Sequence, residues 1–122
     1  MATDAEHRDQ ARANRTHAEW LLAQAVNDPV ARQWAVTATF YSALHAASAY
    51  LVGRGVVVTN HDARNKALAH PGNGVPPAVY GAYRRLQRSS VQARYLMRSF
   101  TPAQVRALIV QELATVLTLA GI

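Results

Sequence analysis

The chain has 122 residues, half of them hydrophobic, with no cysteine and a formal net charge of +6. This length is enough for one domain with a buried core and leaves no room for a second domain. The absence of cysteine excludes disulfides, thiolate metal ligands and a cysteine nucleophile. The N-terminal sequence MATDAEHRDQ lacks the apolar run of a signal peptide, so we expect a cytoplasmic protein.

The basic residues are almost all arginine and are unevenly placed. All but Lys66 of the 13 Lys and Arg residues are arginines, and residues 63–111 contain no Asp or Glu. Such a one-sided basic field suggests a polyanionic partner, with nucleic acid as the first candidate. A solvated arginine-rich surface without a polyanionic partner explains the composition equally well.

The first helix is predicted to start at a capping box, because Thr3 is followed by Glu6 three residues later. Its first half is densely charged, so we expect that half to be solvated. Its second half presents apolar residues for packing: Ala18, Leu21, Leu22, Ala25 and Val26. A tight turn at residues 27–29 leads into the second helix, so the first two helices should be antiparallel neighbours.

The second helix, which starts at Asp28 and Pro29, is predicted to be the centre of the fold. Residues 33–53 contain no Lys, Arg, Asp or Glu. A helix that is apolar nearly all round is buried, and its Thr, Ser and His residues make this one a poor membrane span. One stripe of the helix should form a buried polar seam whose polar atoms need partners; it consists of Trp34, Tyr41, His45 and Ser48.

Three further helices are predicted. Thr59 or Asn60 caps a short helix over residues 61–69, and the Pro- and Gly-rich residues 70–77 end it in a loop. A fourth helix covers residues 78–99, with the core stripe Val79, Tyr83, Leu86, Ser90, Ala93, Met97 and Phe100. Thr101 and Gln104 form a capping box for the last helix, over residues 102–119. The expected fold is all-α: an up-and-down helical bundle of four long helices plus one short helix, in one domain over residues 1–122.

The sequence predicts neither a metal nor a cofactor. It lacks a Gly-rich phosphate loop, an HExxH motif and a carboxylate cluster, and its five histidines are not at paired metal spacing. The remaining His, Arg, Tyr, Ser and Asn side chains suit phosphate binding or metal-free chemistry on phosphates.

A candidate catalytic group lies on the short helix. His61, Arg64 and Asn65 share one helical face, and the following loop can bring His70 back toward them. Arginine pairs with phosphate in a forked geometry and histidine titrates near neutral pH, so this group can hold a phosphate and move a proton. The structural alternative is a helix-end histidine with Arg64 paired to Asp62 or a backbone carbonyl. From these residues alone, the structural alternative is the preferred interpretation.

Two more groups lie on the fourth helix. Arg94 follows Ser90 by four residues, and Tyr41, His45 or a carbonyl of the short third helix can accept its hydrogen bonds. We interpret this group as a polar network that fixes the packing of the helices. An outer arc of arginines and tyrosines suits single-stranded RNA, although a solvated face or a dimer interface explains it nearly as well. The arc consists of Tyr80, Arg84, Arg85, Arg88, Arg94, Tyr95 and Arg98.

Three segments together resemble the HEPN domain (higher eukaryotes and prokaryotes nucleotide-binding), a small all-α bundle: FYSALHAASAYL, TNHDARN and AYRRLQRSSVQARY. The resemblance implies a protein that binds RNA or nucleotide. Many HEPN proteins are toxins of toxin–antitoxin pairs that cleave RNA without a metal, in a cleft between the two protomers of a homodimer.

On this resemblance, Arg64, Asn65 and His70, or His61 in place of His70, would be catalytic. Five residues of the outer arc would bind RNA: Arg84, Arg88, Arg94, Tyr95 and Arg98. An antitoxin would be a further partner. The alternative is a non-catalytic helical interaction module, such as the partner of a nucleotidyltransferase-like protein. In that case the polar residues Tyr41, His45 and Ser90 only fix the packing of the helices.

Overall fold

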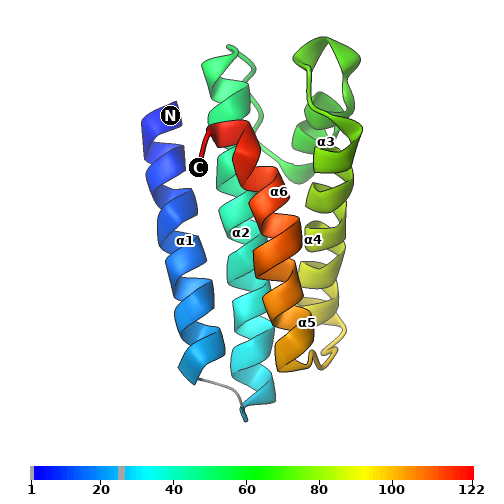
Figure 1. Cartoon of the computed structure of the whole chain (residues 1–122). Helices are drawn as coiled ribbons and strands as arrows, with labels where there is room; N and C mark the ends of the chain where they lie inside the picture. Colours follow the sequence, from blue (N-terminus) through cyan, green and yellow to red (C-terminus); the bar gives the residue numbers. More distant parts are fainter. Residues whose placement is uncertain (1, 25–26) are drawn as a thin grey trace.

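The computed structural model describes residues 2–24 and 27–122, so that Ala25 and Val26 of the predicted apolar end of the first helix lie outside the described residues. Four helical rods form an up-and-down bundle (Figure 1). The first three rods are α1 (Asp4–Gln24), α2 (Pro29–Gly53) and α4 (Pro77–Tyr95). The fourth is continuous and consists of α5 (Pro102–Ala107), η2 (Leu108–Leu113), α6 (Ala114–Leu117) and η3 (Thr118–Ala120).

A short helix, α3 (His61–Ala69), and a 3-10 turn, η1 (Pro71–Asn73), connect α2 to α4. The described residues contain no β-strand. The prediction of an all-α bundle with four long helices and one short helix is therefore confirmed.

The helices begin where side-chain caps are predicted. Each cap accepts a backbone N–H of the first turn, which satisfies a group that has no partner inside the helix. The capping residues are Thr3, Asp28, Asn60 and Thr101. Because these caps are local, they fix where α1, α2, α3 and α5 begin, whereas α4 begins without a side-chain cap.

The central position of α2 is confirmed. It lies between α1 and α4, with the C-terminal rod packed across it (Figure 1). Its fully buried residues include Ala43, Ala46 and Ala47, whose small side chains allow neighbouring helices to approach closely. The antiparallel α1 packs along the length of α2, and the Ser42 hydroxyl donates to the Ala11 carbonyl at 2.7 Å. The predicted solvation of the first half of α1 is therefore wrong at its inner face, where Ala11 is buried.

The end of α4 differs from the prediction. The helix stops at Tyr95 rather than Ser99, because the N–H groups of Leu96 and Arg98 both bond to the Gln92 carbonyl, at 3.2 and 3.1 Å. Between them, Met97 has a φ of 52°, in the left-handed region. Met97 is consequently 79% exposed and does not belong to the core stripe. The last residue of that predicted stripe, Phe100, is buried as expected.

The polar seam of α2 is buried only in part. Ser48 is buried, and Tyr41 and His45 are half-buried, but Trp34 is 59% exposed. The prediction that Trp34 is buried is wrong because α3 packs against α2 farther along the helix, where Arg64 reaches Ser48. The Trp34 end of the stripe stays open.

The C-terminal rod contains one turn of π-helix, η2, which the prediction of a regular helix did not include. This rod, Pro102–Ala120, is the one helix of the described residues that is long and apolar enough to cross a membrane, by length and composition only. Within the bundle its Leu113, Val116 and Leu117 side chains are buried in the core.

Candidate phosphate-binding site

Arg64 is a buried arginine without a carboxylate partner. Its side chain is 8% exposed and extends from α3 toward α2, where Nε donates to Ser48 Oγ at 3.2 Å. Its Nη1 atom lies 3.5 Å from Nδ1 of His61. The ion pairs of the described residues are made by Lys and Arg residues other than Arg64. The guanidinium is always charged, so its burial is compensated here only by neutral acceptors.

The position of Arg64 follows from the start of α3. Asn60 accepts the Ala63 N–H at 2.7 Å, which fixes the first turn of the helix. His61 and Arg64 are three residues apart and share one face, as predicted. Asn65 instead turns toward α4, where Nδ2 donates to Gln87 Oε1 at 3.1 Å.

His7 of α1 and His45 of α2 lie beside this arginine. Their Nδ1 atoms are 3.0 Å apart, so one ring donates a hydrogen bond to the other. Burial lowers the pKa of His7, and the nearby Arg64 charge lowers it further. Burial also lowers the pKa of His45, with His7 and Arg64 as the smaller causes. Sequence reasoning missed His7, although a stripe of His7, Ala11 and Ala18 at helical spacing points to the face that packs on α2.

The pKa values of two other titratable groups at the site are also shifted in the direction that favours the uncharged form. Burial lowers the pKa of His61, and the charges of Arg64 and Arg94 lower it further. Burial raises the pKa of Tyr83 to about 12, and Arg64 offsets part of that rise. The histidines and the tyrosine beside the two arginines therefore favour their uncharged forms, and the arginines supply positive charge at the site.

Arg94 connects this cluster to α2. Its Nη1 donates to the Tyr41 hydroxyl at 3.1 Å, and its Nε donates to the Ser90 carbonyl at 3.4 Å. The guanidinium also stacks over two rings, with its central carbon 5.6 Å from the Tyr41 centroid and 5.0 Å from that of Tyr95. Tyr41 was one of the expected acceptors of Arg94, whereas the carbonyl that accepts belongs to α4 itself and not to the short third helix.

Three buried polar atoms of the described residues have no hydrogen-bond partner: Asn65 Oδ1, Tyr83 Oη and Ser90 Oγ. Such atoms are rare in folded proteins. All three belong to α3 or α4. Of the three residues, Tyr83 is the one on whose pKa the Arg64 charge acts, whereas Asn65 contacts Gln87 of α4.

His70 is separate from this cluster. It is exposed at the C-terminal cap of α3, and its Nδ1 accepts the Gly72 N–H at 3.0 Å. Six residues of helix correspond to about 600° of rotation, so His70 and Arg64 start from different sides of α3. Within one chain, the structure brings His61 rather than His70 to Arg64.

The outer arc of α4 is divided between two sides of the helix. Arg94 faces α2, whereas Arg85, Arg88 and Arg98 line a separate hollow of about 240 Å³ against the C-terminal rod. In that hollow Arg85 pairs with Glu112 at 2.9 Å. Arg84 donates to the Tyr80 hydroxyl at 3.1 Å. The arc does not form one continuous surface with Arg64.

No group of three or more His, Asp or Glu side chains in the described part of the chain is placed to hold a metal ion. The chemistry available at the site is that of arginine, histidine and tyrosine. Comparisons with protein-family models, curated proteins and solved structures give no match for this chain. The resemblance to HEPN domains therefore rests on the three sequence segments alone.

Proposed function

We propose that this chain is a HEPN-like protein that binds RNA or nucleotide, with a phosphate group held at Arg64. The observation that supports this most strongly is the burial of Arg64 with Ser48 and His61 as its acceptors and no carboxylate beside it. A phosphate would supply the missing negative charge. It could also accept hydrogen bonds from the guanidinium N–H groups that Ser48 and His61 do not use.

The histidines support the same proposal. The pKa values of His7, His45 and His61 are lowered first by burial and then by neighbouring positive charge. A bound phosphate would favour the protonated form of each ring, so binding would be coupled to proton uptake. Protonated histidines would in turn strengthen the attraction for the anion.

Cleavage of RNA would use the same residues. A ribose 2′-OH would attack the adjacent phosphorus and the 5′-oxygen would leave, while Arg64 stabilises the added charge. His61 lies next to Arg64 and would accept the 2′-OH proton as the general base, while water would protonate the departing 5′-oxygen. His70 would reach the phosphate only from the second protomer of a homodimer.

The test uses a fluorescently labelled single-stranded RNA in excess chelator. Binding is followed by fluorescence polarisation and cleavage by gel electrophoresis, for wild type, Arg64→Ala, His61→Ala, His70→Ala and the control Lys66→Ala. We expect Arg64→Ala to lose binding, His61→Ala to lose cleavage, and Lys66→Ala to behave as wild type. Lys66 is on the same helix but exposed, and it pairs with Asp62 at 3.0 Å. Equal binding by Arg64→Ala and Lys66→Ala would overturn the proposal.

A non-catalytic interaction module is the second candidate, and it is favoured by the way polar contacts join different helices. Arg94 with Tyr41 connects α4 to α2, and Asn65 with Gln87 connects α3 to α4. A purely structural role predicts that substitutions at these positions lower the melting temperature. It also predicts that His61→Ala changes nothing in an RNA assay.

A further inference from the structure

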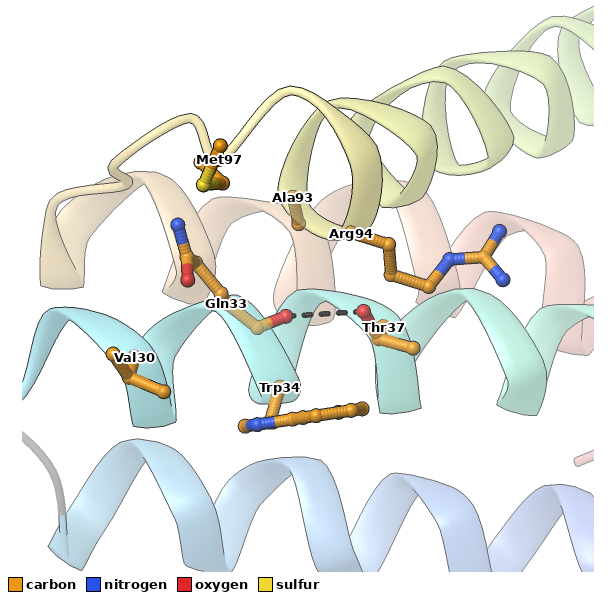
Figure 2. Close-up of a pocket in the computed structure, with 7 residues that line it drawn as sticks. All are labelled: Val30, Gln33, Trp34, Thr37, Ala93, Arg94 and Met97. Atoms are coloured by element: carbon orange, nitrogen blue, oxygen red, sulfur yellow. Dashed lines mark hydrogen bonds between the residues drawn. The ribbon is translucent and has the colours of Figure 1, made fainter.

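Trp34 stands between two hollows on the face formed by α1, α2 and α4. The first, of about 310 Å³, is shown in Figure 2, and Arg94 and Met97 line it beside the indole. The second, of about 300 Å³, is lined by Trp34 together with His17 and Tyr41. The Trp34 side chain, which is 59% exposed, is therefore accessible from both sides.

This face is connected to the Arg64 site through packed side chains. Arg94 lines the first hollow and bonds to Tyr41, which lines the second. The Phe40 ring then lies 5.4 Å from that of Tyr41 and 5.9 Å from that of His61. In Figure 2 the Arg94 guanidinium extends away from Met97, along α2. Because Phe40 is buried, this connection is made through packed rings, and Arg94 is the charged group that faces the hollows.

The charge and size of the hollows indicate what can fill them. Neither is lined by Asp or Glu, and Arg94 contributes a positive charge. Their volumes are at the lower limit of small-molecule pockets, about 300 Å³. An exposed indole beside an arginine is the arrangement on which bases of single-stranded nucleic acids stack, because every base has a π face.

We propose that Trp34 is a base-stacking subsite for single-stranded RNA, with a backbone phosphate of the same strand at Arg94. This inference rests on the proposed function, and it specifies the ligand further. Trp34 and Ser48 lie about 21 Å apart along α2, from a rise of about 1.5 Å per residue. A ligand that contacts both Trp34 and the Arg64 site is therefore longer than one nucleotide, which makes an oligonucleotide the ligand of this proposal.

The test exploits the two tryptophans of the chain. In a Trp20→Phe background, Trp34 is the only indole, and its fluorescence is recorded during titration with a decamer of uridine. A decamer of the same charge that lacks bases serves as the second probe. We expect the uridine decamer to quench Trp34 and to bind at least about fivefold more tightly than the abasic decamer.

Trp34→Ala should remove this difference without changing the affinity for the abasic decamer or the melting temperature, and Val110→Ala, another exposed apolar residue, should preserve it. If the two decamers bind equally and do not quench Trp34, but binding still requires Arg64, the subsite is overturned and the proposed function remains intact. Failure of both decamers to bind would overturn both proposals. A third outcome is that Trp34 fluorescence depends on protein concentration but not on RNA, and that Trp34→Ala sediments with a smaller mass than wild type. This outcome would assign the face to a second copy of the chain and overturn the subsite.

Discussion

His7 and His45 join α1 to α2 through a hydrogen bond between their Nδ1 atoms, 3.0 Å apart. One Nδ1 must carry the proton and the other must accept it, so the bond is lost when both rings are protonated. The pair lies within the field of Arg64, which disfavours the charged form of either ring. Stability and ligand binding should therefore both depend on pH near neutrality.

The free energy of unfolding should fall as the pH decreases below about 6.5, the ordinary histidine pKa. The pKa values of His7, His45 and His61 are lowered in the folded state, so the unfolded chain binds more protons in this window. The stability contributed by the neutral rings is fully present above pH 6.5 and is lost as the pH falls through the folded pKa values. Urea denaturation between pH 7.5 and 5 measures this, and a His7→Gln, His45→Gln double variant should show a smaller fall. An unchanged slope in the double variant would contradict the assignment.

Tyr41→Phe should lower the free energy of unfolding by about 1 kcal/mol, the usual net value of one hydrogen bond. The substitution removes the acceptor of Arg94 Nη1 and keeps the ring that stacks against it. Thermal denaturation provides the measurement. Tyr95→Phe is the matched control, since Tyr95 is 67% exposed and its ring alone contacts Arg94. A comparable loss in both variants would rule out a specific role for the Tyr41 hydroxyl.

Ser48→Ala should destabilise the protein by about 1–3 kcal/mol, because Arg64 Nε then loses its acceptor inside the bundle. The loss should shrink when RNA is present, since a phosphate can accept the same hydrogen bond. Melting temperatures with and without a short RNA test both statements. The exposed substitution Ser99→Ala should have little effect in either condition. A Ser48→Ala variant as stable as Ser99→Ala would show that the Arg64–Ser48 contact does not matter.

The fold and the helix starts could be predicted because they depend on local rules. The charge-free residues 33–53 of α2 and the caps at Thr3, Asp28, Asn60 and Thr101 are visible in the sequence. The end of α4 was not, because no Gly or Pro marks it and the stop depends on two N–H groups sharing the Gln92 carbonyl. Helical periodicity continues through Met97 in the sequence although the helix does not.

The candidate site was only partly predictable. Helical spacing alone places His61 beside Arg64. Tyr41 was named as one of three acceptors for Arg94 because a partly buried arginine needs hydrogen-bond partners. The contact of His7 with His45 joins residues 38 positions apart and depends on how α1 and α2 align. The exposure of Trp34 could not be predicted, because the sequence of a helix that is apolar all round does not show which stripe its neighbours leave open.

The most direct test of a phosphate site at Arg64 compares two variants of equal net charge, Arg64→Gln and Lys66→Gln, in their affinity for a short single-stranded RNA across a range of salt concentrations. Arg64→Gln should bind at least about tenfold more weakly than Lys66→Gln, because it loses a charge-assisted contact rather than a distant charge. Its salt dependence should also be shallower by about 0.7 in log–log slope, the value for one phosphate contact on a single strand. Equal affinities and equal slopes for the two variants would contradict the assignment of Arg64 as the phosphate ligand.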